Sequence, residues 1–338
     1  MRALELTGFD GPASLRIAER GTPDPGPGEA RVRFRASALN HLDVFVTRGL
    51  PKRPLPAVLG ADGAGVVEAV GDGVDRARVG EEVVLYPVVS CGACESCRRG
   101  EEVHCEKFGI LGEHVDGTFQ DALVVPERNL FARPRHLTWT EAAALPLSFL
   151  TAERLLFTRG GLRTGDALVV VGIGGGVALA SLLLAKARGL RVYVTSRDEA
   201  KRERAKALGA DGAFPSAGFA KAVRDATGGE GARAVVDTVG PATIDESFRA
   251  LAREGMVLSV GSTSAPKIEL VMPRLFFRHL SLVTSTMGTS REFASMLAAV
   301  ERAKIRPVVD ATYPLESGAE AFARLEAGEQ FGKLVLEP

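Results

Sequence analysis

The chain has 338 residues, of which 46% are hydrophobic, and its 42 Lys and Arg residues balance 42 Asp and Glu residues. This length is typical of two domains, and a net charge of zero argues against electrostatic binding to nucleic acid or to a membrane surface. No stretch approaches the roughly twenty apolar residues of a membrane span, and the charged N-terminal segment lacks the apolar centre of a signal peptide. We therefore expect a cytoplasmic protein that acts on a small molecule.

Short apolar or alternating runs, separated by Gly and Pro, fill the first part of the chain and predict strands. Together they indicate a partly closed β-domain. The predicted strands cover residues 2–7, 30–39, 63–71, 81–89 and 121–126.

All four cysteines lie in one fifteen-residue window that reads C-x2-C-x2-C-x7-C. They are Cys91, Cys94, Cys97 and Cys105. Four thiolates at this spacing can surround one tetrahedral zinc, with Gly92 and Gly100 supplying tight turns. Because a closed four-sulfur site has no open coordination position, we predict one structural zinc per chain, which fits a reducing compartment. The alternatives are an iron–sulfur cluster, for which the last spacing is too long for the bacterial ferredoxin run, and four unrelated core thiols.

Near Thr138 the pattern changes to strands that alternate with helices, which is typical of an α/β fold with a doubly wound parallel sheet. A first helix is predicted over residues 138–157. Predicted strands then cover residues 166–173, 191–196, 232–240, 255–262 and 280–288. Predicted helices cover residues 175–189, 198–209, 219–228, 243–254 and 291–305.

The tail over residues 311–338 returns to the strand-and-turn pattern of the first part. We therefore predict a cofactor domain over residues 135–289. It would be inserted into a second domain made of residues 1–134 and 290–338.

A glycine-rich turn lies directly between a buried strand and a helix. Glycines there let the backbone approach a pyrophosphate closely, and the helix N-terminus offers free N–H groups to phosphates. The turn therefore predicts dinucleotide binding. The predicted binding residues of the turn are Gly172, Gly174, Gly175, Gly176 and Val177, and we add Gly240 and Gly261 at the ends of later strands.

The end of the next strand indicates which dinucleotide binds. NAD sites usually place an acid there, whereas this chain has Ser196 and Arg197, with Lys201 one turn later. A hydroxyl and two cations suit the 2′-phosphate of NADPH. NADH is the alternative, because Asp198 follows closely and could bind a ribose if the turn is displaced.

Several motifs carry a resemblance to a known family. They are GADGAGVVEAVG at residues 60–71, the cysteine window, the glycine-rich second half and FGKLVL at residues 331–336. The whole chain resembles the medium-chain dehydrogenase/reductase superfamily. The resemblance implies a GroES-like catalytic domain, a Rossmann cofactor domain, an active cleft between them, and a homodimer or homotetramer often built through the edge strand of the cofactor sheet. Within the closing motif, we assign Lys333 to cofactor binding.

The departures from this family concern its second, catalytic zinc. The positions that resemble the Cys, His and Cys ligands of that zinc are Asn40, Ala61 and Leu147 here, and these side chains cannot replace them. The resemblance therefore implies a chain that keeps the structural zinc and lacks the catalytic one. An unusual site formed by His41, Asp43 and His114 is the alternative.

The segment ALNHLDVFVTRG at residues 38–49 is similar to zinc-free quinone reductases and enoyl reductases of this superfamily. Without a metal to hold an alkoxide, reduction of an activated alkene is less demanding, because charge spreads into an enolate. We predict NADPH-dependent reduction of a C=C bond conjugated to a carbonyl, in an enone, a quinone or an enoyl thioester such as an acyl-CoA. The alternatives are an NAD(P)-dependent alcohol or aldehyde dehydrogenase and a non-catalytic nucleotide-binding protein.

Several side chains are candidates for the chemistry. The candidate catalytic residues are Asn40, His41, Asp43 and Thr151. We expect Ser148 near the nicotinamide and Asp62 paired with a cation, while Tyr86 and His114 are further proton-donor candidates. Arg48, Lys52 and Arg53 are either ligands of CoA phosphates or ordinary surface charges. Phe149, Phe276 and Phe277 either line an apolar pocket or pack in the core.

Overall fold

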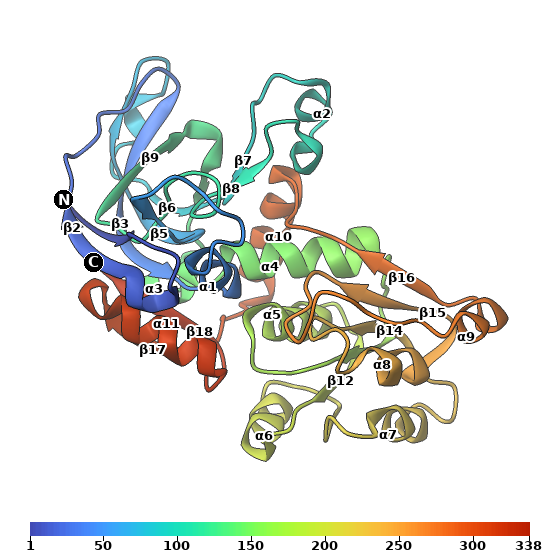
Figure 1. The fold of residues 1–338 in the computed structure, drawn as a ribbon. Helices are drawn as coiled ribbons and strands as arrows, with labels where there is room; N and C mark the ends of the chain where they lie inside the picture. The colour runs from blue at the N-terminus through green and yellow to red at the C-terminus, as the bar shows by residue number, and fades with distance from the viewer. The chain divides into compact units, whose positions relative to one another are not determined.

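The computed structural model describes every residue, Met1–Pro338, and divides into two compact units (Figure 1). The first unit comprises Met1–Ser148 and Gly288–Pro338, and the second comprises Phe149–Met287. The second unit is inserted between the two segments of the first, and it begins fourteen residues after the start, at residue 135, that we predict for the cofactor domain. The reason is that the helical segment before Ser148 contacts the strands of the first unit, and the Leu147 N–H donates to Asp62 there.

The first unit is built mainly from antiparallel strands. Its strands are β1 (Arg2–Leu6), β2 (Leu15–Glu19), β3 (Glu29–Ala38), β4 (Ala57–Val58), β5 (Asp62–Val70), β6 (Glu82–Leu85), β7 (Val88–Val89), β8 (Gly109–Ile110), β9 (Ala122–Pro126), β10 (Leu130–Ala132), β17 (Val309–Pro314) and β18 (Lys333–Glu337). The seven-stranded sheet has the order β10-β6-β5-β3-β18-β17, with β9 also paired to β3. A three-stranded sheet, β2-β1-β4, and the β7-β8 pair complete the unit. This arrangement confirms the predicted GroES-like β-domain.

Alternation explains the central strand β3, because Ala30, Val32 and Phe34 are buried on one face while the residues between them are more exposed. Strand pairing then places the candidate site. Antiparallel pairing aligns Val335 of β18 with Ala38 of β3, and Asp62 of β5 also pairs with Ala38. Residues that lie just beyond the end of β3 therefore meet the start of β18 and the start of β5.

Helices connect and flank these strands. In and beside the first unit they are α1 (His41–Thr47), α2 (Glu95–Arg98), α3 (Trp139–Ala143), α4 (Pro146–Glu153), α10 (Ser290–Ala303) and α11 (Gly318–Ala327). The helix predicted over residues 138–157 is interrupted between α3 and α4, and α4 continues as a π-helical segment, Arg154–Arg159. None of the helices is both long enough and apolar enough to cross a membrane.

The second unit contains one parallel sheet. Its strands are β11 (Ala167–Val170), β12 (Arg191–Thr195), β13 (Gly212–Phe214), β14 (Ala232–Val236), β15 (Leu251–Ser259) and β16 (Ser281–Thr284). Its helices are α5 (Gly176–Ala187), α6 (Glu199–Ala207), α7 (Phe219–Ala226), α8 (Ile244–Ala250) and α9 (Met272–Arg278). The order β13-β12-β11-β14-β15-β16, with every pair parallel, is that of a Rossmann fold and confirms the predicted doubly wound sheet.

Two expectations for individual elements were wrong. The helix predicted over residues 243–254 ends at Ala250, because Leu251 already pairs with Ala232 of β14. The tail, predicted as strand and turn, contains α11. That helix buries Ala321, Phe322 and Leu325 in the core of the first unit.

Candidate functional site

A buried lysine lies at the centre of the predicted catalytic residues of the first unit. The Lys333 Nζ donates to Asp62 Oδ2 at 2.8 Å and to Asn40 Oδ1 at 2.5 Å, and lies 3.5 Å from Ser148 Oγ. The side chain of Lys333 is 5% exposed and that of Asp62 is fully buried. The expected pairing of Asp62 with a cation is confirmed, and the cation is Lys333.

The other polar atoms of this group are also paired. Asn40 Nδ2 donates to Asp62 Oδ2 at 2.9 Å, and the Leu147 N–H donates to Asp62 Oδ1 at 2.7 Å. The Ser148 hydroxyl is held less tightly, because its Oγ donates to Asn40 Oδ1 at 3.5 Å. That distance is longer than an ordinary O–H···O hydrogen bond. Ser148, which is buried, therefore has the weakest donor contact of this group.

Asp43 fixes the turn that presents Asn40. Its two carboxylate oxygens accept the N–H groups of Asn40 at 2.7 Å and Gly60 at 3.1 Å. Burial raises the pKa of Asp43 to about 7, although those hydrogen bonds and the Lys333 charge act in the opposite direction. Asp43 thus holds the start of α1 against the Gly60 turn.

The positions that resemble catalytic-zinc ligands offer no suitable donors. Asn40 is bonded to Asp62 and Lys333, Ala61 has only a methyl group, and Leu147 has an isobutyl group. The alternative set of His41, Asp43 and His114 does not come together, since the structure forms its one group of three or more metal-ligating side chains elsewhere. The residues present therefore do not fit a catalytic zinc.

The remaining candidates occupy separate environments. His41 begins α1, where partial desolvation by the surrounding protein, followed by the Lys333 charge, lowers its pKa. Thr151 belongs to the second unit and is buried, with its Oγ1 3.9 Å from Met287 Sδ. The Tyr86 hydroxyl donates to the Gly288 carbonyl at 2.8 Å, and His114 Nδ1 accepts the Ile110 N–H at 3.2 Å.

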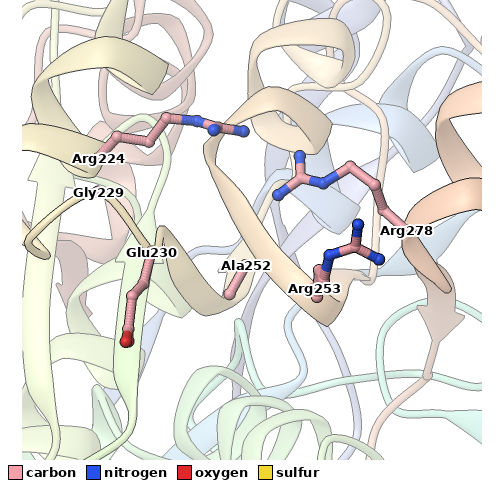
Figure 2. A pocket seen from close by; sticks show the side chains of 6 residues that line it. All are labelled: Arg224, Gly229, Glu230, Ala252, Arg253 and Arg278. Carbon is pink, nitrogen blue, oxygen red and sulfur yellow. The ribbon is translucent and has the colours of Figure 1, made fainter.

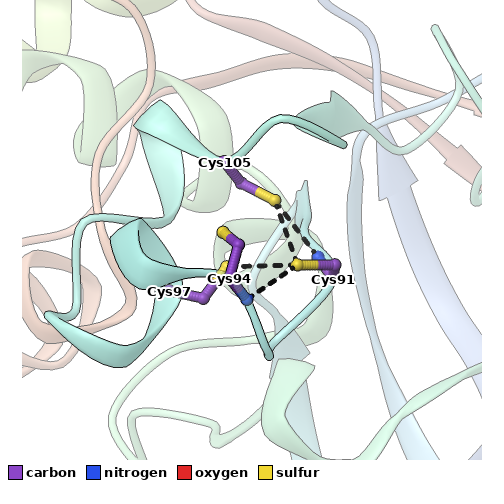
Figure 3. A group of neighbouring side chains, drawn as sticks. All are labelled: Cys91, Cys94, Cys97 and Cys105. Atoms are coloured by element: carbon purple, nitrogen blue, oxygen red, sulfur yellow. Dashed lines mark hydrogen bonds between the residues drawn. The ribbon is translucent and has the colours of Figure 1, made fainter.

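The four cysteines do converge, as Figure 3 shows. Their sulfur atoms all lie within 4.8 Å of one another. Zinc–sulfur bonds of about 2.3 Å require sulfur–sulfur separations of about 3.8 Å in a tetrahedron. Cys91 Sγ lies 3.9 Å from Cys97 Sγ and 3.5 Å from Cys105 Sγ. The cluster fits a four-thiolate structural zinc, and the neighbouring His104 is exposed and outside it.

Backbone turns and N–H groups near the cysteines affect the geometry and the pKa values of their thiols. Gly92 and Gly100 have φ values of +72° and +75°, which confirms that they form tight turns. The N–H groups of Ala93 and Cys94, followed by the Cys105 thiol, lower the pKa of Cys91 to about 6. Burial and the neighbouring thiols raise the pKa of Cys97 to about 12. A bound cation would lower the pKa of all four thiols, because it favours the thiolate form of every ligand.

The predicted phosphate turn of the second unit has the necessary geometry. Gly172 and Gly174 have φ values of +73° and +135°, which favour glycine. Gly175 is the N-cap of α5, and a Cβ added there would meet nothing within 4 Å. Gly176 and Val177 begin α5, so their N–H groups lack intrahelical partners. These residues leave open space in front of free N–H donors, which suits a pyrophosphate.

Other predicted cofactor residues share the same edge of the sheet. Because the strands are parallel, the segments after β11, β12, β14 and β15 lie at their carboxyl ends, and these carry Gly172, Ser196, Gly240 and Gly261 respectively. Close packing also requires glycine at position 240, since a Cβ there would lie 2.1 Å from Ser262 Oγ.

The charged residues that follow β12 lie at the start of α6. Asp198 is the N-cap of α6 and accepts the Lys201 N–H at 3.3 Å. Arg202, which the sequence argument missed, donates to the Ser196 carbonyl at 2.9 Å, while Arg197 is exposed. Arg202 lies four residues after the N-cap Asp198, and residues at that spacing face the start of the helix. This spacing could have identified Arg202 from the sequence.

Two of the three cations considered for CoA phosphates already have partners. Arg53 is nearly buried and binds Asp116 and two carbonyl groups, Arg48 pairs with Glu326, and Lys52 is exposed. Core packing of Phe276 and Phe277 is excluded, because both side chains are exposed, while their role in an apolar pocket stays a prediction. These rings lie 4.6 Å apart on the surface of α9, whereas Phe149 is buried.

Comparisons with known proteins agree with this fold. The chain matches the zinc-binding dehydrogenase family over residues 176–302 and the alcohol dehydrogenase GroES-like domain over residues 26–135. A zinc-type alcohol dehydrogenase-like protein of Schizosaccharomyces pombe is 31% identical, over 98% of this chain and 97% of that protein. An acryloyl-coenzyme A reductase of Sulfurisphaera tokodaii is 28% identical, over 96% of each chain.

A crystal structure of an NAD-dependent alcohol dehydrogenase matches the whole of both chains, with a TM-score of 0.97 and 44% identity. These relatives are named as a reductase, a dehydrogenase and a dehydrogenase-like protein, and each covers 96% or more of the present chain. The protein is accordingly an NAD(P)H-dependent oxidoreductase, and the chain belongs to the medium-chain dehydrogenase/reductase superfamily.

Proposed function

We propose that this enzyme reduces a C=C bond conjugated to a carbonyl, with NADPH as the hydride source. The observation that carries the proposal is the Lys333 group, in which a buried ammonium is bonded to Asn40 and Asp62. Asn40, Ala61 and Leu147 occupy the positions that resemble the catalytic-zinc ligands of the family's metal-dependent members. Ala61 precedes Asp62 in the chain, and the Leu147 N–H donates to it. A buried cation at that place disfavours a second cation there.

The charge at this group suits an enolate better than an alkoxide. Lys333 and Asp62 form an ion pair with no net charge, so the group lacks the strong positive charge of a divalent metal. Conjugate reduction places negative charge on an oxygen that shares it with the α-carbon, and one or two hydrogen-bond donors can hold it. The weakly bonded hydroxyl of Ser148 would be such a donor, and the Lys333 ammonium lies 3.5 Å from its oxygen.

The reaction balances with these components. When bound at the glycine turn, NADPH would supply a hydride to the carbon β to the carbonyl. The electrons of the C=C bond move to form the enolate, whose oxygen Ser148 holds by a hydrogen bond. Collapse of the enolate takes one proton at the α-carbon, and water supplies it, so no side chain has to be consumed. Enones and enoyl thioesters permit this sequence, whereas a quinone would take its proton on oxygen and leave as the hydroquinone. An acryloyl-coenzyme A reductase is among the relatives.

The preference for NADPH is supported by the segment after β12. Asp198, the acid that could have bound the ribose of NADH, is used to cap α6. Arg197 and Arg202 offer guanidinium groups beside Ser196, and guanidinium groups match phosphate oxygens. We therefore propose that NADPH is preferred over NADH.

The structure of the NAD-dependent alcohol dehydrogenase supports a second candidate, an alcohol or aldehyde dehydrogenase. A substrate panel separates the two functions. The enzyme is assayed with NADPH and with NADH against enones, quinones, enoyl-CoA thioesters, aldehydes and ketones. We expect turnover of at least one activated alkene. The kcat/KM with NADPH should exceed that with NADH by about tenfold or more, which corresponds to one charge-assisted hydrogen bond.

Faster reduction of aldehydes than of every alkene would contradict the proposal. Binding of NADPH without oxidation of it by any substrate would indicate the non-catalytic alternative.

We also propose a homodimer that forms through α9 and the edge strand β16. Apolar side chains of α9 and of its N-cap Val271 are strongly exposed, at 50%, 56%, 56% and 71% for Val271, Met272, Phe276 and Phe277 respectively. β16 pairs only with β15, so its outer edge is free. An exposed apolar patch beside a free edge is typical of a surface that a second copy covers.

A further inference from the structure

Three arginines converge on a depression in the second unit. Arg224, Arg253 and Arg278 line it together with Gly229, Glu230 and Ala252, and its volume is about 670 Å³. Figure 2 shows the guanidinium groups of Arg224 and Arg278 directed toward one another, with Arg253 beside Arg278. The carboxylate of Glu230 points away from them in the same view.

No carboxylate neutralises these three cations. Arg224 donates to the Arg249 carbonyl at 2.7 Å, Arg278 donates to the Leu251 carbonyl at 2.6 Å, and Arg253 lies 3.4 Å from the Phe277 carbonyl. Burial, followed by the charges of the neighbouring arginines, lowers the pKa of Arg278. Each guanidinium has five N–H donors, so these carbonyl bonds orient the groups and leave most donors available.

The depression is separate from the predicted nucleotide site. Gly229 and Glu230 precede β14, and Ala252 and Arg253 lie in the first residues of β15. The depression is therefore at the amino ends of the parallel strands. The glycine turn follows the carboxyl end of β11, which is the opposite edge of the same sheet.

A second depression extends the positive surface. It shares Arg224, includes Lys221, Arg249 and Arg274, and has a volume of about 500 Å³. Arg274 and Arg249 are paired with Asp245 there, and Glu246 also lines it, so its charge is partly balanced. The uncompensated charge is thus concentrated at Arg224, Arg253 and Arg278.

We propose that this depression is a binding site for a polyphosphate anion, a ligand with two or three linked phosphate groups. Guanidinium groups bind phosphate oxygens in pairs, and three convergent guanidinium groups can engage several phosphates at once. A single carboxylate would leave most of this charge unbalanced. Like charges held together in the free protein cost stability, and a polyanion removes that cost when it binds.

The test is a calorimetric titration of the full-length protein with inorganic tripolyphosphate. Saturating NADPH is present so that the nucleotide site is occupied, and ionic strength is held constant. One tripolyphosphate per chain should bind. Arg253→Ser should weaken binding about tenfold or more, because it removes a charge-assisted contact. Arg253 is exposed and its one carbonyl contact is long, so this variant should fold normally.

Arg302→Ser is the matched control, because Arg302 is an exposed arginine on α10 in the other unit. Its affinity for tripolyphosphate should equal that of the wild type. Absence of binding to the wild type would overturn the proposal. Equal binding by the wild type and by Arg253→Ser/Arg278→Ser would also overturn it.

Discussion

Lys333 links residues that are remote in sequence, since it is 293 positions from Asn40 and 271 from Asp62. The sequence motif that contains it suggested a contact with the cofactor, whereas the structure surrounds its Nζ with Asn40, Asp62 and Ser148. The two assignments predict different kinetics. A residue that binds cofactor affects the KM for NADPH, and a residue that polarises Ser148 affects kcat.

We expect Lys333→Met to lower kcat about 100-fold, the size of one lost charge-stabilising interaction, with little change in the KM for NADPH. The same change leaves Asp62 buried without its cation, so the free energy of unfolding should fall by about 3–5 kcal/mol. Steady-state kinetics and chemical denaturation measure the two effects.

Lys333→Met/Asp62→Asn separates chemistry from folding. It removes both charges and should recover stability without recovering kcat. Recovery of kcat along with stability would show that Lys333 has only a structural role.

Asp43 should make stability depend on pH. Its folded-state pKa of about 7 lies above the usual value near 3.9, so the folded protein holds a proton that the unfolded chain releases between these values. This contribution is fully present below about pH 4 and is lost as the pH rises to about 7. We expect the free energy of unfolding of the wild type to fall relative to Asp43→Asn between pH 5 and pH 8. Denaturation curves that give a constant difference between the two proteins across this range would contradict the assignment.

At the scale of elements, the sequence predicted the features that depend on neighbouring residues alone, such as turns and buried strands. Gly172, Gly174, Gly92 and Gly100 all have positive φ, and each was recognisable as a glycine at a turn. Strands buried on both faces were recognisable from continuous apolar runs. The end of α8 was not recognisable, because pairing of Leu251 with β14 overrides the helical pattern of residues 243–254.

The candidate site was only partly predictable for the same reason. Asn40 and Asp62 could be identified from motifs, but their contact with Lys333 depends on the register of β18 against β3. The arginine depression depends on contacts between loops at one edge of a sheet, which no short motif records.

The exposed surface of α9 gives a prediction at this scale. Phe277→Glu places a charge in the apolar patch and should convert the dimer to a monomer, because a buried unpaired charge is strongly unfavourable. Light scattering should give twice the 35.7 kDa chain mass for the wild type and the chain mass for the variant. A wild type that is monomeric, or a variant that remains a dimer, would contradict the proposed interface.

At the scale of the whole molecule, we propose a chain with one structural zinc and a reaction site without metal. The four cysteines fit a zinc that has a structural role, while the positions of a catalytic zinc hold an amide, a methyl group and an isobutyl group. The second unit has the Rossmann fold and carries the predicted cofactor-binding turn, and the first unit contains the Lys333 group. Hydride transfer to an activated alkene is the chemistry that this combination supports.

The number of zinc ions per active chain tests this account most directly. Metal analysis of the purified enzyme should give one zinc per chain in the wild type and none in Cys94→Ser, which loses one of four ligands. Turnover of the wild type should not increase when more zinc is added. Two zinc ions per chain, with activity that rises and falls with the second, would contradict the account.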